Sequence, residues 1–346
     1  MRGVVYCGPR SVRLADDLPM PTVAGRRDAV VRVTTTAICG TDLHPYRGEI
    51  PAFEPGTVFG HEFVGVVVDA GEDVPFPAGT RVVASDVVAC GRCSVCVKGW
   101  HYHCPQVQLF GSSTLVGPDL PGGQADYVRV PFADVVLSPV PADVADEDAL
   151  FVGDILSTGY GAVAASGIAP GAVVGVVGAG PVGLCAAMCA TAAGASRVVM
   201  ADLDPVRRAF AESLGFTAAA PEEFTAALER ASDKQGARAV IEAVGTGAAL
   251  GLAVDGAGPR STVVAIGVHH APDTPFDAGV AFARELTVRF VVGDPIAVRE
   301  NLVPLLQAGR IVPSKIISHR LSLDDAVRAY ELFDRREASK VVLSTG

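Results

Sequence analysis

Short β-branched runs separated by turn residues dominate the first 150 residues of the chain. Four of these runs have the length of strands, and Gly, Pro and Asp residues break the chain between them: Ala29–Thr35, Phe63–Asp69, Arg81–Val88 and Ala125–Val130. Closely spaced runs of this kind are typical of small β barrels and sandwiches. We therefore expect this part of the chain to form a compact, barrel-like β unit.

The pattern changes near Gly171, where hydrophobic runs begin to alternate with helical segments. The predicted strands are Val173–Val177, Arg197–Ala201, Arg238–Glu242 and Ser261–Ile266. The predicted helices run from Pro181 to about Ala193, or begin at Pro205, near Pro221 and after Thr246. This alternation predicts a parallel, doubly wound sheet. The remaining chain is mixed, with strands at Thr287–Val292 and Lys340–Leu343 and helices at Pro295–Ala308 and Leu323–Phe333.

Length and charge restrict the class of protein. A chain of 346 residues is expected to form about two domains at roughly 150 residues per domain. Its net charge of −10 provides no general attraction to nucleic acid or to an anionic membrane. The N-terminus lacks the apolar run of a signal peptide, so we expect a cytoplasmic protein with reduced cysteines. Residues 171–195 carry no charge, but Pro181 and several glycines interrupt them, which favours strand, turn and helix over a membrane span.

Four of the eight cysteines lie close together in the segment 90–104, namely Cys90, Cys93, Cys96 and Cys104. Four thiolates at this spacing can surround one Zn²⁺ tetrahedrally, and such a complete set leaves no position for a substrate. The segment therefore predicts a structural zinc lobe, whereas unrelated cysteines or two disulfides are the alternatives. His101 and His103, between these ligands, are expected to be solvated. We expect the remaining unassigned histidines in surface loops: His269, His270 and His319.

A second metal site is predicted from residues that lie far apart in the sequence. Cys39 precedes Gly40-Thr41-Asp42-Leu43-His44, and His61 lies within Gly60-His61-Glu62. Two loops that meet at a cleft would place Cys39 and His61 on one metal, and sulfur and nitrogen donors suit Zn²⁺. Asp154, at the junction of the two predicted units, is the expected third ligand. The alternatives are a core thiol for Cys39 and a helix N-cap for Asp154.

A glycine-rich turn predicts a dinucleotide site. Gly178-Ala179-Gly180-Pro181-Val182-Gly183 follows a predicted strand and opens a predicted helix. Such glycines permit a tight turn and let a pyrophosphate approach the helix N-terminus. Asp202, at the end of the next predicted strand, is expected to accept hydrogen bonds from both ribose hydroxyls and to repel a 2′-phosphate, which favours NAD over NADP. A loop-capping role is the alternative for Asp202, and Arg207 is expected beside the adenosine ribose.

These motifs resemble the zinc-dependent medium-chain alcohol dehydrogenases over essentially the whole chain. The resemblance implies that Cys39, His61 and Asp154 hold the catalytic zinc, and that Cys90–Cys104 is the family's structural zinc lobe. It also implies four supporting roles at the catalytic zinc: Glu62 as a nearby or transient ligand, Asp42 as the group that orients His61, Thr41 as the hydroxyl beside the substrate alcohol, and His44 as the far end of a proton relay.

Within the family, two segments resemble the formaldehyde-dehydrogenase-like and secondary-alcohol branches. They are Asp154–Gly161, which includes Thr158, and Leu120–Pro131, which is similar to the former branch. The resemblance implies that Thr158 contacts the nicotinamide. Gly40 departs from the pattern, because some members carry an Arg there that binds the cofactor pyrophosphate. Lys340 is assigned either to that pyrophosphate or to a solvated strand end.

The expected architecture is α/β. A GroES-like β-barrel catalytic domain comprises residues 1–155 and 290–346, and a Rossmann NAD-binding domain comprises residues 156–289. The expected activity is reversible hydride transfer between a primary or secondary alcohol and NAD, with one catalytic and one structural zinc per chain. The alternatives are a formaldehyde-dehydrogenase-like enzyme that acts on an aldehyde hydrate, and a non-catalytic redox sensor that binds NAD and zinc. A homodimer or homotetramer is expected.

Overall fold

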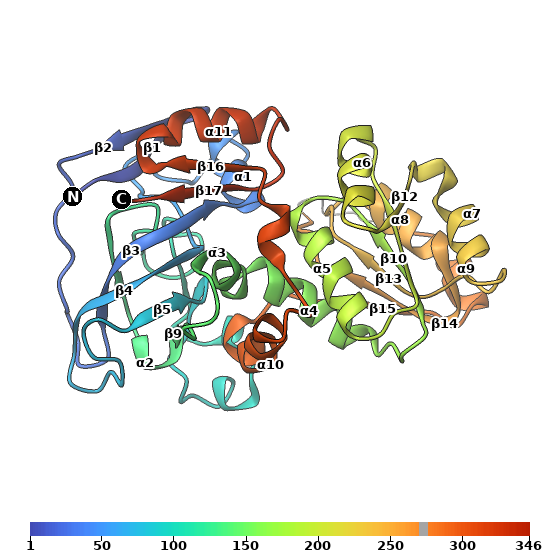
Figure 1. Ribbon diagram of the computed structural model, residues 1–346, viewed down its shortest axis with the longest axis horizontal. Coiled ribbons are helices and arrows are strands. Elements are labelled where there is room, and N and C mark those ends of the chain that lie inside the picture. Colours follow the sequence, from blue (N-terminus) through green and yellow to red (C-terminus); the bar gives the residue numbers. More distant parts are fainter. Residues whose placement is uncertain (270–275) are drawn as a thin grey trace. The chain divides into compact units, whose positions relative to one another are not determined.

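The computed structural model describes residues 1–269 and 276–346, and the chain divides into two compact units (Figure 1). Unit 1 comprises Met1–Asp154, Asp294–Gln307 and Ile316–Gly346. Unit 2 comprises Ile155–Gly293 and Ala308–Lys315. His270, for which a surface loop was expected, lies outside the described residues.

The boundaries differ from the expected ones at three places. Ile155 begins a helix of unit 2, and residues 290–293 and 308–315 also belong to unit 2. The backbone N–H of Val291 donates to the carbonyl of Ala265, 3.0 Å away, which ties residues 290–293 to the sheet of that unit. Ile311 is 2% exposed, and the segment around it lines a cavity together with Met188. These contacts explain why both segments belong to unit 2.

Unit 1 is built on a mixed sheet of seven strands, in the order β16-β17-β3-β4-β5-β9 with β8 also paired to β3. The strands of this sheet are β3 (Ala29–Ile38), β4 (Phe63–Ala70), β5 (Arg81–Ala84), β8 (Tyr127–Val130), β9 (Leu137–Pro139), β16 (His319–Ser322) and β17 (Val341–Ser344). Two small sheets pair β1 (Gly3–Gly8) with β2 (Ser11–Ala15), and β6 (Val87–Val88) with β7 (Gln108–Leu109). The expected β-rich first part is therefore observed, and His319 lies in a strand rather than in a loop.

The predicted strand Arg81–Val88 is interrupted at Ser85 and Asp86. The N–H of Ser85 donates to the carbonyl of Val136, and the N–H of Asp86 donates to the carbonyl of Gly153. These two residues therefore bond to other segments instead of continuing one ladder, and the run divides into β5 and β6.

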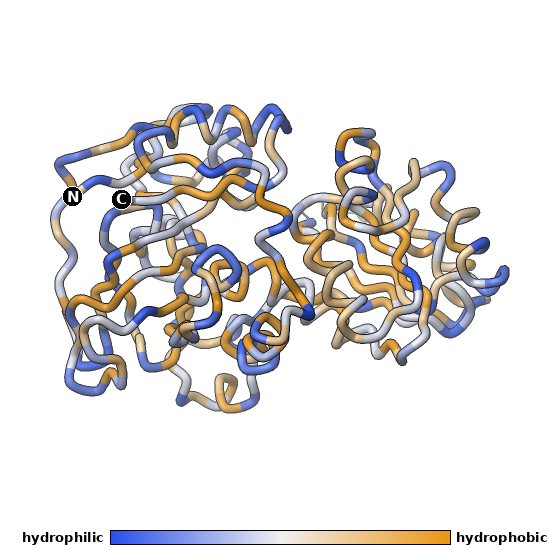
Figure 2. The backbone as a smooth tube through the Cα atoms, viewed as in Figure 1, coloured by the Kyte–Doolittle hydropathy of each residue, from blue (hydrophilic) through white to orange (hydrophobic). Residues whose placement is uncertain are grey.

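Helices and hydrophobic cores complete unit 1. The helices are α1 (Gly40–Tyr46), α2 (Ala133–Val136), α3 (Asp146–Ala149), α10 (Pro295–Gln307) and α11 (Ala326–Asp334), with 3₁₀ turns at Cys96–Lys98, His101–His103, Leu150–Gly153 and Leu323–Asp325. A further 3₁₀ turn, Pro313–Ile316, begins in the segment 308–315 of unit 2 and ends at the first residue of the last segment of unit 1. Tyr330 and Phe333 of α11 pack in one core with Phe59. Alternate side chains of β3, including Val31, pack in another core with Phe63. Figure 2 shows the corresponding hydrophobic stretches along the strands.

Unit 2 contains six parallel strands in the order β12-β11-β10-β13-β14-β15. The strands are β10 (Val173–Val177), β11 (Arg197–Ala201), β12 (Thr217–Ala219), β13 (Ala237–Glu242), β14 (Ala257–Ala265) and β15 (Thr287–Phe290). The helices are α4 (Ile155–Ser166), α5 (Pro181–Ala192), α6 (Pro205–Ser213), α7 (Pro221–Ala231), α8 (Gly247–Gly256) and α9 (Ala278–Ala283). The order reverses beside β10, which is the doubly wound pattern with its switch point at the carboxyl end of that strand.

Helices cover the buried sheet of unit 2. Val173 and Val177 of β10 share a core with Phe224 of α7 and Leu250 of α8. Val174 and its alternate neighbours point to the opposite face because strand side chains alternate, and α4 and α5 pack together against the sheet. This burial of both faces explains why the strand sequences are continuously apolar.

His269 is not a surface histidine, contrary to the expectation. Its side chain is only 11% exposed, and its Nε2 lies 3.0 Å from Oε2 of Glu242, whose other oxygen accepts hydrogen bonds from the N–H groups of Val244 and Gly245. The buried carboxylate at the end of β13 thus draws the histidine inward.

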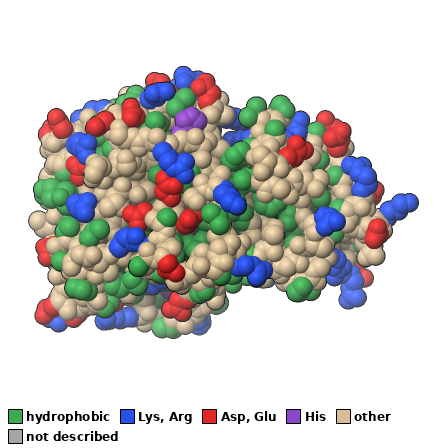
Figure 3. Space-filling view, viewed as in Figure 1, with side chains coloured by type: hydrophobic (Ala, Val, Ile, Leu, Met, Phe, Trp, Pro, Cys, Tyr) green, Lys and Arg blue, Asp and Glu red, His purple; other side chains and the backbone are tan. Residues whose placement is uncertain are grey.

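Among the described residues, no single helix is long and apolar enough to cross a membrane; one bent pair, Asp146–Gly153 with Ile155–Ser166, meets that test only when taken together. The uncharged stretch 171–195 contains β10, the glycine turn and α5. Figure 3 shows acidic and basic side chains interspersed on the visible face of each unit.

Candidate metal and dinucleotide sites

Cys39, His61 and Asp154 come together within unit 1 although three separate segments supply them. Cys39 connects β3 to α1, His61 precedes β4, and Asp154 follows the 3₁₀ turn Leu150–Gly153. One donor atom from each residue lies within 4.8 Å of the others. Nε2 of His61 is 3.2 Å from Oδ2 of Asp154, and Sγ of Cys39 is 3.5 Å from the same oxygen. The three residues thus form one compact group of sulfur, nitrogen and oxygen donors.

Neighbouring residues fix the orientation of His61. Gly60 has a φ of 102°, and a Cβ at this position would lie 2.7 Å from the backbone nitrogen of Gln124, so a larger residue does not fit. Oδ1 of Asp42 lies 3.4 Å from Nδ1 of His61, and its Oδ2 accepts a hydrogen bond of 2.9 Å from the N–H of Cys39. Asp42 thus lies against Nδ1 of the imidazole, while Nε2 is directed at the donor group.

The electrostatics of this group fit a bound cation. Burial raises the pKa of the Cys39 thiol to about 11, and the charges of Asp154 and Glu62 add to that shift. Although burial lowers the pKa of His61, the charges of Asp42 and Cys39 raise it well above its usual value. A thiolate and a carboxylate this close together need a positive charge between them. Zn²⁺ accepts this donor set, and metal-binding histidines commonly have a carboxylate on the other ring nitrogen.

Glu62 and Lys340 form a buried ion pair beside this group. Nζ of Lys340 donates to Oε2 of Glu62, and both side chains are 1% exposed. Oε1 of Glu62 has no hydrogen-bond partner among the described residues. Burial raises the pKa of Glu62, although the charge of Lys340 opposes the shift. Glu62 is not one of the clustered donors.

This pair corrects one of the two expectations for Lys340, the solvated strand end. Val341 of β17 pairs with Ile38 of β3, so the strand register brings Lys340 to the segment that leads into Cys39. Its ammonium also lies 5.8 Å from the centroid of the Phe151 ring. Lys340 is therefore not a solvated strand end, and its contact with a pyrophosphate stays a prediction.

Thr41 and His44 lie on α1, the helix that begins directly after Cys39. Oγ1 of Thr41 is 3.8 Å from Sγ of Cys39. Nδ1 of His44 is 2.6 Å from Oε2 of Glu49, and the His44 side chain is 25% exposed. One short helix thus carries a hydroxyl at the donor group and an imidazole within reach of solvent. Glu49 was not singled out from the sequence.

Asp86 is a second acidic side chain that sequence reasoning missed. It is 4% exposed, and its Oδ2 accepts a hydrogen bond from the hydroxyl of Tyr102 in the cysteine lobe. Burial, and next the charge of Asp154, raise the pKa of Asp86 to about 8. The polar pair Ser85-Asp86 interrupts an otherwise apolar run, and this is the sequence signal that could have indicated a buried polar role.

The four lobe cysteines also converge, and their Sγ atoms all lie within 4.8 Å of one another. The Sγ–Sγ distance is 3.4 Å for Cys93–Cys96, 4.0 Å for Cys90–Cys96 and 4.0 Å for Cys93–Cys104. Four sulfurs on one zinc at the usual Zn–S length of about 2.3 Å would be about 3.8 Å apart. Hydrogen bonds, first from the N–H of Cys96, lower the pKa of Cys93 to about 6. The lobe therefore has the spacing that a tetrahedral zinc requires.

The glycine turn of unit 2 has the geometry of a phosphate-binding turn. Gly178 has a φ of 101°, and a Cβ on Gly183 would lie 1.9 Å from the carbonyl oxygen of Gly178. Gly180 caps α5, whose first residues are Pro181 and Val182. The turn thus follows β10 directly and opens a helix, so it can receive a pyrophosphate at the helix N-terminus.

Asp202 lies at the carboxyl end of β11, beside this turn. Its Oδ2 accepts a hydrogen bond of 2.8 Å from the N–H of Ala179, and its Oδ1 accepts one of 2.9 Å from the N–H of Asp204. Nη1 of Arg207 is 3.9 Å from the Oδ2 atom. The carboxylate thus joins β11 to the glycine turn; its contact with a ribose stays a prediction.

Thr158 lies in the first turn of α4 in unit 2. A Cβ on Gly293 would lie 2.1 Å from its Oγ1, so the two residues are in close contact. The contact of Thr158 with the nicotinamide stays a prediction.

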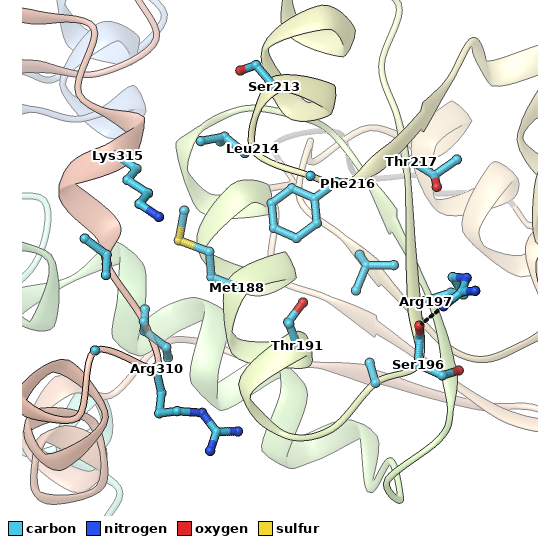
Figure 4. A pocket seen from close by; sticks show the side chains of 16 residues that line it. Met188, Thr191, Ser196, Arg197, Ser213, Leu214, Phe216, Thr217, Arg310 and Lys315 are labelled. Atoms are coloured by element: carbon cyan, nitrogen blue, oxygen red, sulfur yellow. Dashed lines mark hydrogen bonds between the residues drawn. The ribbon is translucent and has the colours of Figure 1, made fainter.

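A cavity of about 800 Å³ in unit 2 lies away from the glycine turn, at the amino ends of β11 and β12 (Figure 4). Arg197, Arg310 and Lys315 contribute basic side chains to its lining. The ammonium of Lys315 points toward Met188, whereas the guanidinium of Arg310 points away from Phe216 (Figure 4). The cavity therefore does not form a converged charged site.

Comparisons with known proteins agree with the fold. The sequence model of the alcohol dehydrogenase GroES-like domain matches residues 25–141, and that of the zinc-binding dehydrogenases matches residues 181–308. The chain is 37% identical over 332 residues to a probable zinc-binding alcohol dehydrogenase of Mycobacterium tuberculosis, covering 95% of this chain and 84% of that relative.

Solved structures show the same likeness. Alcohol dehydrogenase TADH from Thermus sp. ATN1 has 39% identity and a TM-score of 0.95, with 99% of both chains covered. A putative zinc-binding dehydrogenase from Sinorhizobium meliloti 1021, solved bound to NADP, has 28% identity and a TM-score of 0.85, with 99% of this chain and 98% of that chain covered.

The chain belongs to the zinc-dependent medium-chain alcohol dehydrogenases. The predicted combination of a GroES-like domain with a Rossmann-type parallel sheet is confirmed. Its activity class is that of an oxidoreductase acting on alcohols, and the family supports zinc and a nicotinamide nucleotide as its cofactors.

Proposed function

We propose that this protein catalyses reversible hydride transfer between a primary or secondary alcohol and NAD, to give an aldehyde or a ketone. The observation that carries the proposal is the convergence of Cys39, His61 and Asp154 directly before a helix that bears Thr41 and His44. A redox sensor needs the metal ligands but has no use for a hydroxyl and an imidazole on the adjoining helix. The arrangement therefore favours an enzyme.

Different residues of the chain have different roles in the proposed reaction. A zinc ion held by Cys39, His61 and Asp154 would supply a Lewis acid that favours loss of the substrate hydroxyl proton, and bound NAD would supply the hydride acceptor. Asp42 orients the imidazole of His61. Thr41, beside Sγ of Cys39, accepts the substrate proton as it passes its own proton outward. His44 receives that proton within reach of solvent.

The lobe thiolates Cys90, Cys93, Cys96 and Cys104 are proposed to hold a second, structural zinc. Since four sulfurs complete a tetrahedral shell, this zinc has no position for substrate. We assign NAD rather than NADP because the carboxylate of Asp202 stands at the end of β11, where it would repel a 2′-phosphate.

Assembly of two or four chains is also proposed, through the β15 edge of the unit 2 sheet. β15 is the last strand in the order of described strands, so one of its edges has no partner strand there. Three apolar side chains near this edge are exposed: Phe282 (88%), Phe290 (63%) and Val292 (63%). An open strand edge beside exposed aromatic residues commonly marks an interface between protein copies.

A panel of alcohols with NAD or NADP, monitored by reduced-cofactor absorbance, tests the proposed activity. We expect primary or secondary alcohols to be oxidised with NAD in wild-type enzyme, and the activity to disappear after chelation and return with zinc. Turnover confined to formaldehyde, as the hydrate, would instead favour the aldehyde-oxidising alternative. Lack of turnover with every alcohol and aldehyde, despite NAD binding, would contradict the proposal that the protein is an enzyme.

A further inference from the structure

Glu49 is held across the end of α1 by two contacts with a single residue, His44. Its side-chain Oε2 lies 2.6 Å from Nδ1 of the imidazole. Its backbone N–H donates a hydrogen bond of 2.9 Å to the carbonyl of His44. His44 and Glu49 therefore contact each other through both their backbones and their side chains.

The residues between His44 and Glu49 form a tight turn that brings Glu49 back to the end of α1. Gly48 has a φ of 76°, the left-handed conformation that favours glycine, and its N–H donates to the carbonyl of Pro45. Nε of Arg47 donates a hydrogen bond of 2.6 Å to Oδ1 of Asp334 in α11. A backbone hydrogen bond therefore closes the turn after α1, and the contact of Arg47 with Asp334 ties it to α11. Together these contacts hold Glu49 beside the imidazole of His44.

The contact determines which nitrogen of His44 carries its hydrogen. A carboxylate can only accept a hydrogen bond, so Nδ1 must donate to Glu49 and the lone pair of the neutral ring lies on Nε2. A carboxylate hydrogen-bonded to one ring nitrogen holds a catalytic histidine in one tautomer and one orientation.

We propose that Glu49 is a positioning residue for proton transfer through His44, an inference that rests on the proposed function. A proton that arrives from Thr41 is bound by the lone pair of Nε2, and the imidazolium so formed keeps its Nδ1–H bond to Glu49. The same proton then leaves Nε2 for water or a buffer base, and the ring returns to its first tautomer with no net change in charge. The side chains are 25% exposed for His44 and 46% exposed for Glu49, so solvent can take up the proton.

Variants at Glu49 and His44 separate this role from a merely structural one. The variants are Glu49→Ala, which removes the acceptor, Glu49→Gln, which keeps an acceptor oxygen but removes the charge, and His44→Ala. Glu54→Ala is the matched control, because Glu54 is exposed in the same loop and its side chain has no ion pair among the described residues. The rate of the first turnover is measured by NADH absorbance at several concentrations of HEPES, a bulky tertiary-amine base.

We expect Glu49→Ala to slow the first turnover about tenfold in dilute buffer, which is less than the loss of a complete acid–base group. The substrate KM should stay close to that of wild type. Rising HEPES concentration should restore the rate of Glu49→Ala and of His44→Ala, because an external base replaces the relay. Glu49→Gln should lie between Glu49→Ala and wild type, and Glu54→Ala should be insensitive to buffer.

Two results would overturn the inference. One is a Glu49→Ala enzyme with the wild-type rate while His44→Ala is slow and rescued by buffer, which would leave the proposed function intact. The other is a slow Glu49→Ala enzyme that no buffer concentration restores, which would indicate a structural defect. If His44→Ala itself kept the wild-type rate, both the relay and the role of Glu49 would be wrong.

Discussion

The ammonium of Lys340 is paired with the carboxylate of Glu62, and neither side chain is exposed by more than 1%. Removal of one partner from a buried ion pair leaves the other charge without compensation and costs about 3–5 kcal/mol. We predict that Lys340→Met lowers the free energy of unfolding by that amount, as measured by urea denaturation. The double variant Lys340→Met/Glu62→Gln should recover most of the loss. A single variant with the wild-type urea midpoint would show that Glu62 is not a buried charge that depends on Lys340.

Loss of the structural zinc should mainly lower the stability of the fold, and it should affect catalysis only through that loss of stability. We predict that Cys93→Ser yields an unstable or aggregating protein with about half of the wild-type zinc content, since the lobe then has three sulfur ligands. Zinc analysis and thermal unfolding check this, with Cys7→Ser as control because Cys7 is exposed and outside both donor groups. Two zinc ions per chain and wild-type melting in Cys93→Ser would refute the four-cysteine site.

Cofactor choice should depend on the carboxylate of Asp202. We predict that Asp202→Gly raises the kcat/KM ratio of NADP to NAD, because the variant removes the repulsion of a 2′-phosphate and the acceptor for the ribose hydroxyls. Steady-state kinetics with both cofactors provide the ratio. If the wild-type enzyme already preferred NADP, that measurement alone would refute the assignment of Asp202.

The β15 edge of the unit 2 sheet should determine the oligomeric state. We predict that Phe282→Asp shifts the protein toward the monomer, because a charge would be buried in the apolar contact. Light scattering after size-exclusion chromatography measures the mass. Leu203→Asp is the control, since Leu203 is also exposed (81%) but follows β11 instead. An unchanged mass for Phe282→Asp, or dissociation by the control, would place the interface elsewhere.

The sequence predicted most of the fold because strand and helix periodicity and the glycine turn are local signals. The strands of unit 2 follow from continuous apolar runs such as Val173–Val177, and Gly178 and Gly183 mark the turn after the first of them. The break at Ser85 and Asp86 was missed because it depends on hydrogen bonds to Val136 and Gly153, which lie far away in the sequence.

The donor residues could be predicted from residue type, but their neighbours could not. Cys39 and His61 stand in recognisable motifs, whereas the ion pair of Lys340 with Glu62 depends on the register between β17 and β3. In the same way, the contact between His44 and Glu49 depends on the left-handed turn at Gly48. Side-chain pairing across elements is a tertiary property, and no local pattern records it.

Asp154→Ala is the variant that tests the zinc-dependent mechanism most directly, with zinc content and turnover measured on the same preparation. We predict that this variant loses the zinc held with Cys39 and His61 and nearly all turnover, while it keeps the lobe zinc and binds NAD as wild type does. If Asp154 only capped the following helix, the variant would keep both zinc ions and its activity and would lose about 1 kcal/mol of stability. That result would contradict the central claim.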